Sequence, residues 1–296
     1  MLFRSGKTRR VGIFHYGYPW EENLTLKEKV KQAIYETSWR GSNWEKLLFV
    51  NPVVYESMAK KHAALSSRIA LLPDPVPPKL EIDSLEARQR LGIPLDGVYI
   101  GFVGMMDQRK AIPELLAAFV NANAFKSSRL LLAGLLAEEY FQLINEKYSS
   151  LIKNQSIILI NRHLTNEEIQ FGYQAIDVHA LLQYRRMNLS ANLLKAATYH
   201  KPVIVDDCGY TGMMAKRFNL GITCDVNNLD SVSEAIKKSI QIAPSFKSSA
   251  QTNRLIAFHH PDNYANTIMN ESIGNKNHAQ NFEVKTWDWV CEGVVI

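Results

Sequence analysis

Short apolar runs recur along the chain and alternate with longer segments in which apolar residues return every three or four positions. Runs of this kind predict buried strands, and the longer periodic segments predict amphipathic helices. Beyond residue 95 the strands are expected at 98–103, 129–133, 156–160, 178–182, 202–205 and 222–225, with helices near 112–122, 137–150, 166–174, 190–199, 212–218 and 231–242. Strands that are apolar throughout and separated by helices are typical of a parallel sheet covered on both faces. The pattern therefore predicts an α/β fold with a doubly wound parallel sheet.

A shorter version of the same alternation precedes a proline-rich segment. Strands are expected at 11–15, 47–50 and 69–72, and helices at 25–39 and 52–62. The run PDPVPP that follows continues neither kind of element, because proline fixes φ and lacks a backbone donor. We therefore predict an incomplete N-terminal Rossmann-like domain (1–72), a linker (73–80), a C-terminal domain (81–272) and a tail (273–296).

Several helix ends carry capping signals. Asn51 before Pro52 predicts a helix start, and Gly92 predicts the end of a short helix over 84–91. Three capping boxes are expected, at Thr25 with Glu28, Thr165 with Glu168, and Ser231 with Glu234.

Composition excludes several classes of protein. The 296 residues are 46% apolar and 21% charged, unlike a disordered or collagen-like chain. The three cysteines lie far apart and form no CxxC or Cys/His cluster, so neither a disulfide framework nor a zinc site is expected. No apolar run approaches the roughly 20 residues of a membrane span, and the first residues lack the apolar core of a secretion signal. We expect a soluble, cytoplasmic protein.

The net charge of +5 lies in the first third of the chain, where residues 1–95 hold 15 basic and 10 acidic side chains. A solvated basic face explains this excess. An anionic partner is the alternative, either a phosphate-bearing ligand or the cytoplasmic leaflet of a membrane. No nucleic-acid recognition motif accompanies the charge, so nucleic acid is not expected as a partner.

The turn after the strand at 98–103 contains Gly104, Arg109 and Lys110, directly before a predicted helix. Cations at a helix start oppose the helix dipole unless an anion is also present. A nucleotide diphosphate would satisfy both charges, whereas the alternative is a solvated basic pair on an exposed turn.

The turn after the strand at 178–182 leads to Ser190, a predicted N-cap. Its helix would direct backbone amides into the crevice beyond the carboxyl ends of the strands, where ligands of such sheets bind, and would favour phosphate there. Arg185 and Arg186 either add positive charge beside this helix start or form an ordinary exposed pair. Asp206 and Asp207, after the next strand, hold a sugar hydroxyl or cap the following helix.

These segments, in this order, resemble the C-terminal donor domain of GT-B glycosyltransferases, in particular glycosyltransferase family four, the group 1 glycosyltransferases. The resemblance covers about residues 69–272. It rests on PDPV, FVGMMDQRKAIPELLAAF, LLLAG, the segment around HALLQY, LSANLLKAATYHKPVIV and the segment beginning DDCGYTG.

The resemblance implies an enzyme that moves a sugar from a nucleotide diphosphate sugar to an acceptor hydroxyl, with retained anomeric configuration and without metal or other cofactor. It places Lys110, with Arg109 beside it, on the donor diphosphate. Leu189 and Ser190 fall where the family's backbone amides bind the phosphates. The sequence has no Asp-x-Asp pair to hold a divalent cation.

Two departures from the family pattern concern the grip on the donor. The family's paired glutamates would fall at Met187 and Lys195, and Lys195 replaces an acceptor with a cationic donor. Met105 stands where arginine is common.

A third departure is the short first domain, because an acceptor domain commonly has about 150 residues. The segment VGIFHYG resembles the strand that delivers a histidine to the interdomain cleft. His15 is then the candidate catalytic residue on the acceptor side, although a lone histidine is more often structural.

Three functions follow as hypotheses. The first is a glycosyltransferase acting on a carbohydrate or lipid-linked acceptor in polysaccharide biosynthesis, with Gly104, Arg109, Lys110, Arg185, Leu189, Ser190 and Lys195 around the donor. The second is a catalytically degenerate GT-B module that binds a nucleotide or a partner without turnover. The third is an accessory protein of surface-polysaccharide synthesis, in peripheral contact with the inner membrane face.

Overall fold

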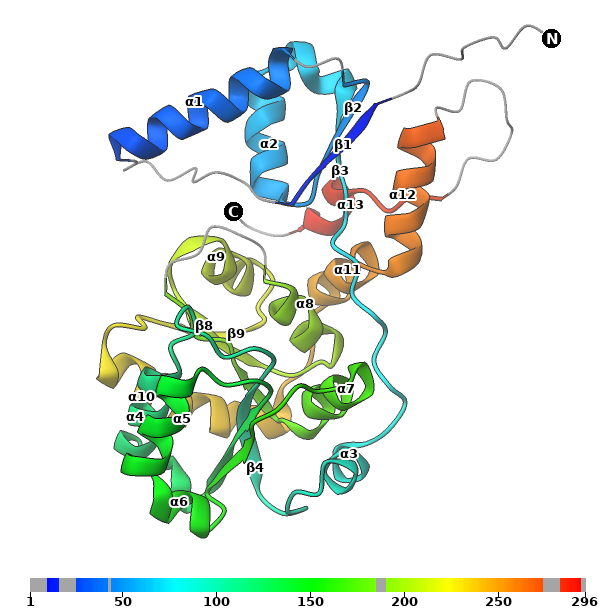
Figure 1. Cartoon of the computed structure of the whole chain (residues 1–296). Coiled ribbons are helices and arrows are strands. Elements are labelled where there is room, and N and C mark those ends of the chain that lie inside the picture. Colours follow the sequence, from blue (N-terminus) through cyan, green and yellow to red (C-terminus); the bar gives the residue numbers. More distant parts are fainter. Residues whose placement is uncertain (1–9, 16–24, 42–43, 185–189, 274–282, 294–296) are drawn as a thin grey trace, which may run out of the picture. The chain divides into compact units, whose positions relative to one another are not determined.

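Figure 1 shows the computed structural model of the chain, which describes residues 10–15, 25–41, 44–184, 190–273 and 283–293. Two compact units divide the chain. The first combines the residues up to Pro75 with Ala257–Glu292, and the second is built from Val76–Arg186 and Ser190–Ile256. Within the described residues, no helix has both the length and the apolar character needed to span a bilayer.

The larger unit is built on six parallel strands in the order β6-β5-β4-β7-β8-β9. They are β4 (Val98–Val103), β5 (Ser128–Ala133), β6 (Ile157–Ile160), β7 (Val178–Ala180), β8 (Val203–Asp206) and β9 (Gly221–Cys224). The chain winds outward from β4 to β6, returns to the other side of β4, and winds outward again from β7 to β9. This confirms the predicted doubly wound parallel sheet.

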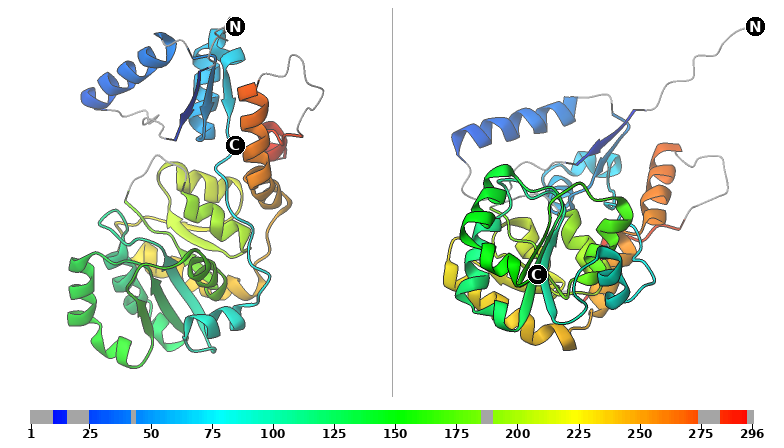
Figure 2. Two further views of the ribbon diagram at one scale, coloured as in Figure 1. Left: turned by 45° about the vertical axis from the view of Figure 1, so that its right-hand side comes forward. Right: turned by 60° about the horizontal axis from the view of Figure 1, so that its bottom comes forward.

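Helices cover both faces of this sheet (Figures 1 and 2). Helices α4 and α10 pack together on one side, and α3 and α7 pack together on the other. The helices of the unit are α3 (Ser84–Leu91), α4 (Ile112–Asn121), α5 (Glu138–Lys147), α6 (Ser149–Lys153), α7 (Asn166–Ala175), α8 (Ala191–Thr198), α9 (Gly209–Arg217), α10 (Leu229–Ile242) and α11 (Ala250–Phe258, which extends into the smaller unit), with 3₁₀ turns η2 (Ala124–Lys126) and η3 (Ala243–Ser245).

A buried arginine fastens α3 to the sheet. The Arg88 guanidinium donates to Asp177 Oδ2 at 2.8 Å and to the carbonyl of Ala175 at 3.0 Å. Asp177 Oδ2 also accepts the amide of Tyr99 in β4, at 2.8 Å. Because Arg88 is only 5% exposed, its charge depends on these partners rather than on water.

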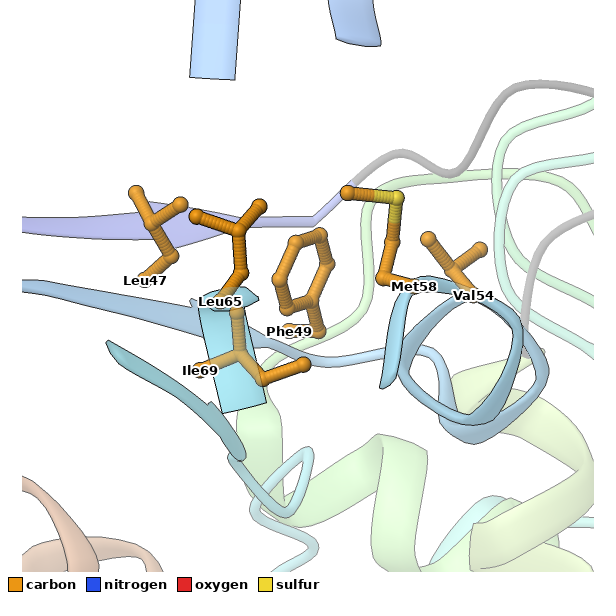
Figure 3. Packing of buried hydrophobic residues seen from close by; sticks show 6 residues of the cluster. All are labelled: Leu47, Phe49, Val54, Met58, Leu65 and Ile69. Atoms are coloured by element: carbon orange, nitrogen blue, oxygen red, sulfur yellow. The ribbon is translucent and has the colours of Figure 1, made fainter. Parts of the chain in front are cut away.

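The smaller unit contains three parallel strands in the order β1-β2-β3. Its elements are β1 (Val11–Phe14), α1 (Leu26–Gly41), β2 (Lys46–Phe49), α2 (Pro52–Lys61), η1 (Ala63–Arg68), β3 (Ile69–Leu71), α12 (Pro261–Ile273) and α13 (Trp287–Cys291). One apolar cluster joins β2 and β3 to α2 and η1 through Leu47, Phe49, Val54, Met58, Leu65 and Ile69 (Figure 3). A second cluster, on Leu48, Val50 and Leu72, packs against Tyr264 and Ile268 of α12. The predicted Rossmann-like character of this part is confirmed.

The C-terminal residues belong to the smaller unit by their contacts. The buried Trp287 donates from Nε1 to Glu56 Oε1 of α2 at 2.7 Å. The compact units thus have other bounds than the predicted segments 81–272 and 273–296, because Ala257–Glu292 group with the N-terminal strands. Acceptor and donor roles for the predicted segments stay predictions.

The helix starts test the capping predictions. The boxes at Thr25 and Thr165 are both formed, with reciprocal bonds to Glu28 and Glu168. The predicted box at Ser231 is wrong, because α10 begins earlier. Asn228 is its N-cap and accepts the amide of Ser231 at 3.1 Å, while the Ser231 hydroxyl accepts the amide of Asp225.

Candidate functional site

The order of the strands reverses between β4 and β7, which are neighbours in the sheet. In open parallel sheets, ligands bind outside the carboxyl ends of the strands at such a reversal. The chain that leaves β4 runs here beside the chain that leaves β7. The amide of Ala111 donates to the carbonyl of Leu182, and the amide of Tyr184 donates to the carbonyl of Arg109, both at 3.3 Å. The two turns selected from the sequence therefore meet.

Two glycines allow close backbone contact at the edge of the sheet formed by the carboxyl ends of its strands, here called the rim. Gly104 has φ 127° and Gly134 has φ 131°, values that favour glycine. A Cβ on Gly134 would lie 2.1 Å from the carbonyl oxygen of Gly104, so the turns after β4 and β5 are in direct backbone contact. A Cβ on Gly104 would lie 3.7 Å from Asn192 Nδ2 at the start of α8. Gly104 and the α8 N-terminus are thus adjacent.

Helix α8 begins at this rim. Ser190 is its N-cap in extended conformation, as predicted, and its carbonyl accepts the amide of Leu193 at 2.9 Å. The Ser190 side chain makes no capping hydrogen bond. The first amides of a helix, here those of Ala191 and Asn192, have no acceptor inside the helix. Such a helix start attracts phosphate or carboxylate groups.

Lys110 lies on the turn after β4 and points to the turn after β7. Its Nζ donates to Gln183 Oε1 at 3.2 Å and lies 5.6 Å from the ring centroid of Phe102. Gln183 is 6% exposed, and its Nε2 donates to the Thr211 hydroxyl of α9 at 3.3 Å. Gln183 therefore orients the ammonium group, a role that the sequence analysis missed.

Arg109 is held by a neighbouring carboxylate. Its Nε donates to Asp107 Oδ2 at 2.7 Å, and Asp107 Oδ1 accepts its amide at 3.0 Å. This hydrogen bonding to Arg109 holds the pKa of the Asp107 carboxyl below its usual range. Because Asp107 offsets much of the Arg109 charge, Lys110 contributes more of the positive charge at the rim.

An acidic group lies at the carboxyl end of β8. Asp206 is 5% exposed and accepts the amide of Val226 at 3.2 Å, and burial raises its pKa. Among the described residues, Asp206, Asp207 and Cys208 have ligand atoms within 4.8 Å of one another, a spacing that could suit a metal ion. The prediction that an aspartate caps α9 is wrong, since Cys208 is the N-cap and its side chain makes no capping hydrogen bond. An Asp206 or Asp207 contact to a sugar hydroxyl stays a prediction.

The family of the chain follows from its sequence match. Residues 83–254 match the family described as glycosyl transferases group 1. The chain belongs to the group 1 glycosyl transferases. No curated protein matches the sequence.

Solved structures show the same GT-B fold as this group 1 chain. Sucrose-phosphate synthase from Thermosynechococcus elongatus has a TM-score of 0.61 at 17% identity and covers 87% of this chain. A glycosyltransferase from Rickettsia africae has a TM-score of 0.65 at 15% identity, with 90% of this chain and 71% of that chain covered. Alr3699/HepE from Anabaena, solved with UDP and glucose, has a TM-score of 0.56 at 14% identity, with 84% and 70% covered. The chain spans 65% of the synthase, just under two thirds of its length.

Lys195, at a position where group 1 sequences were expected to carry glutamate, lies on α8 beside α7. Its Nζ is 5.9 Å from the ring centroid of the buried Tyr173. Both residues line a cavity of about 300 Å³, whose other lining residues are Pro77, Asn166, Ile169, Gln170 and Tyr199. None of Gly104, Lys110 and Ser190 lines it. The structure therefore does not group Lys195 with these rim residues, and its predicted donor contact stays untested.

The other predicted residues stand apart from the rim. Arg185, Met187 and Leu189 lie outside the described residues. His15 directly follows β1 in the smaller unit and is exposed. Its acceptor-side role stays a prediction.

Proposed function

We propose that this group 1 chain transfers a sugar from a nucleotide diphosphate sugar to a hydroxyl of a carbohydrate or lipid-linked acceptor. The observation that carries the proposal is the meeting of two turns at the β4–β7 reversal, with the Lys110 ammonium and the N-terminus of α8 on the same rim. The presence of UDP and glucose in the HepE structure supports a nucleotide sugar as donor. Cytoplasmic location and a role in polysaccharide biosynthesis belong to the same proposal.

The chemistry needs positive charge where the leaving group forms. Breaking the bond between the anomeric carbon and the diphosphate oxygen leaves negative charge on that oxygen, and fixed donors at this place lower the barrier. In the proposal, Lys110 and the amides of Ala191 and Asn192 supply those donors. Gly104 leaves room for the phosphates to approach the backbone.

Retention and metal independence come from the family resemblance. In this scheme Lys110 takes the part that a divalent cation plays elsewhere, so transfer should persist in EDTA. The anomeric configuration of the product, read by NMR, tests retention. Loss of transfer in EDTA together with its restoration by Mn²⁺ would refute metal independence and direct attention to Asp206 and Asp207.

Calorimetric titration of the full chain with UDP and GDP tests the donor site. Replacing Lys110 with alanine removes a charged hydrogen bond of about 1.5–3 kcal/mol, so the Kd should rise about tenfold to a hundredfold. Lys153→Ala, at an exposed position on α6, is the matched control and should bind as the wild type does. Absence of binding by the wild type to any common nucleoside diphosphate contradicts the proposal.

A second candidate is a nucleotide-binding module without turnover. Lys195 favours it, because this lysine stands at a sequence position where a family glutamate was expected to hold the donor, and it lies over Tyr173 instead. Such a module would bind UDP with dependence on Lys110 and would neither transfer nor hydrolyse a donor sugar. Release of UDP from a UDP-sugar by the purified chain eliminates this alternative.

A further inference from the structure

The cavity between α7 and α8 reaches from the surface of the larger unit to a buried aromatic floor. Pro77 and Asn166 are exposed at its mouth, whereas Tyr173 and Tyr199 at its base are 1% and 6% exposed. Its volume of about 300 Å³ is at the lower end of the range for small-molecule sites in proteins. The cavity therefore has room for a ligand built on a single ring.

The floor of this cavity is a stack of rings. The Tyr173 ring centroid is 4.8 Å from that of His179 in β7 and 5.7 Å from that of Tyr199, with interplanar angles of 26° and 25°. His179 Nε2 also pairs with the carbonyl of Tyr173 at 3.1 Å. Because burial lowers the pKa of His179 to about 3, this ring is uncharged at neutral pH. The floor is thus a packed and uncharged aromatic surface.

The described residues that line the cavity include one cation and no carboxylate. Lys195 supplies the charge, and its Nζ lies 5.9 Å from the Tyr173 ring centroid. Pro77 and Ile169 add apolar surface to that of the two tyrosines. Apolar walls with a few polar groups and one charge are typical of a site for a small organic ion. The sign of the charge favours an anion.

The Tyr173 hydroxyl is a second donor at this cavity. It is buried and has no hydrogen-bond partner among the described residues. Buried hydroxyls without a partner are uncommon in proteins, because they lose their hydrogen bonds to water without replacement. Burial also raises the pKa of Tyr173 far above its usual value, so the hydroxyl keeps its proton. Tyr173 and Lys195 thus bring a neutral and a charged donor to the same cavity.

We infer that this cavity binds a small aromatic acid. Lys195 Nζ and the Tyr173 hydroxyl hold the anionic group, and the ring lies against Ile169 and Pro77. An aromatic body suits the site because the rings of the floor favour contacts with another ring. The site is separate from the proposed donor site, since the residues assigned to the donor diphosphate do not line it. The inference does not rest on donor chemistry.

Fluorine NMR of the full chain with para-fluorobenzoate tests the inference. Wild type should bind this probe with a Kd of about 1 mM or lower. Para-fluorobenzyl alcohol keeps the ring and lacks the charge, so it should bind about tenfold more weakly or worse. Lys195→Gln should raise the Kd for the acid about tenfold or more, and Lys195→Arg should retain most of the affinity because it keeps the charge. Tyr173→Phe should raise the Kd about threefold to tenfold.

Two other lysines provide the controls. Lys153→Gln, at an exposed position on α6, should bind the probe as wild type does. Lys110→Ala, which should weaken UDP binding, should leave the Kd for the probe unchanged, so the two sites are tested independently. Melting curves report whether each variant is folded. Tyr173→Phe should not lower the melting temperature, because the hydroxyl that it removes has no partner to lose.

Several results would overturn the inference. They are absence of binding of para-fluorobenzoate by wild type, unchanged binding by Lys195→Gln, and displacement of the probe by inorganic phosphate at equal concentration, which would make the ring irrelevant. Displacement by UDP would overturn the separate site and assign the cavity to the donor nucleotide. An unchanged Kd in Tyr173→Phe would remove the hydroxyl from the site.

Discussion

Gln183→Glu is the sharpest test of how the rim holds charge. The substitution keeps the size of the side chain and exchanges the amide that accepts from Lys110 for a carboxylate. Gln183 also donates to Thr211, whose hydroxyl can rotate and donate to the new carboxylate instead. The fold should therefore tolerate the change, and its effect should fall on the bound anion.

The magnitude follows from the distances. At the 3.2 Å that separates Lys110 Nζ from Gln183 Oε1, an ion pair attracts by about 5 kcal/mol at an effective dielectric constant near 20, before desolvation is subtracted. A phosphate on Lys110 would lie about 6 Å from the new carboxylate, where unit charges repel by about 3 kcal/mol on the same basis. Screening reduces this repulsion, so the Kd for UDP should rise about tenfold to a hundredfold.

Calorimetry across pH provides the assay. The affinity difference between Gln183→Glu and wild type should be full at pH 7.5 and should shrink in acid as the introduced carboxyl group takes up a proton. Gln142→Glu, at an exposed position on α5, adds the same charge away from the rim and should leave the Kd unchanged. If Gln183→Glu binds UDP as tightly as wild type while its melting temperature is also unchanged, Lys110 does not hold the diphosphate and the reasoning is wrong.

Three further predictions concern stability. Gly104→Ala should lower the free energy of unfolding by about 1–3 kcal/mol because of its positive φ. Gly134→Ala should lower it more, since its Cβ would also overlap the Gly104 carbonyl. Urea unfolding measures both changes, and equal values contradict the backbone contact between Gly134 and Gly104. Arg88→Met should lower the free energy of unfolding by about 2–4 kcal/mol, because Asp177 loses its main partner. The double variant with Asp177→Asn should recover part of that lost stability in the same assay. No recovery counts against the ion pair. Burial lowers the pKa of His179 to about 3, so below pH 6.5 the unfolded chain binds a proton that the folded chain does not. The free energy of unfolding should then decrease by up to about 1.4 kcal/mol for each pH unit as the pH is lowered below 6.5. His179→Phe should lessen this decrease in melting curves at pH 7 and pH 5, and an unchanged dependence of stability on pH is the contrary result.

The sequence predicted the elements of the larger unit well, since their signals are local. The strand Val98–Val103 and the helix Ser84–Leu91 have the predicted bounds, because apolar continuity defines the first and Gly92 ends the second. The capping prediction at Ser231 was wrong because Asn228, three residues earlier, is an equally suitable N-cap and accepts the Ser231 amide. Local patterns leave such competing starts unresolved.

The site was predicted less completely, because its geometry depends on sheet order. Lys110 and Ser190 each carried a signal beside a helix start. Gln183 carried none, since its partners Lys110 and Thr211 lie 73 and 28 residues away and only the β4–β7 pairing brings them together. The burial of Trp287 likewise carried no local signal, because its partner Glu56 is 231 residues away.

The start of α8 has a consequence for how this protein can diverge. Main-chain donors are common to every amino acid except proline, so an anion site built on Ala191 and Asn192 does not depend on which side chains stand there. Side chains at these two positions can therefore change without loss of the amides on which the proposed site depends. Proline at either position is the substitution that natural variation would be expected to avoid.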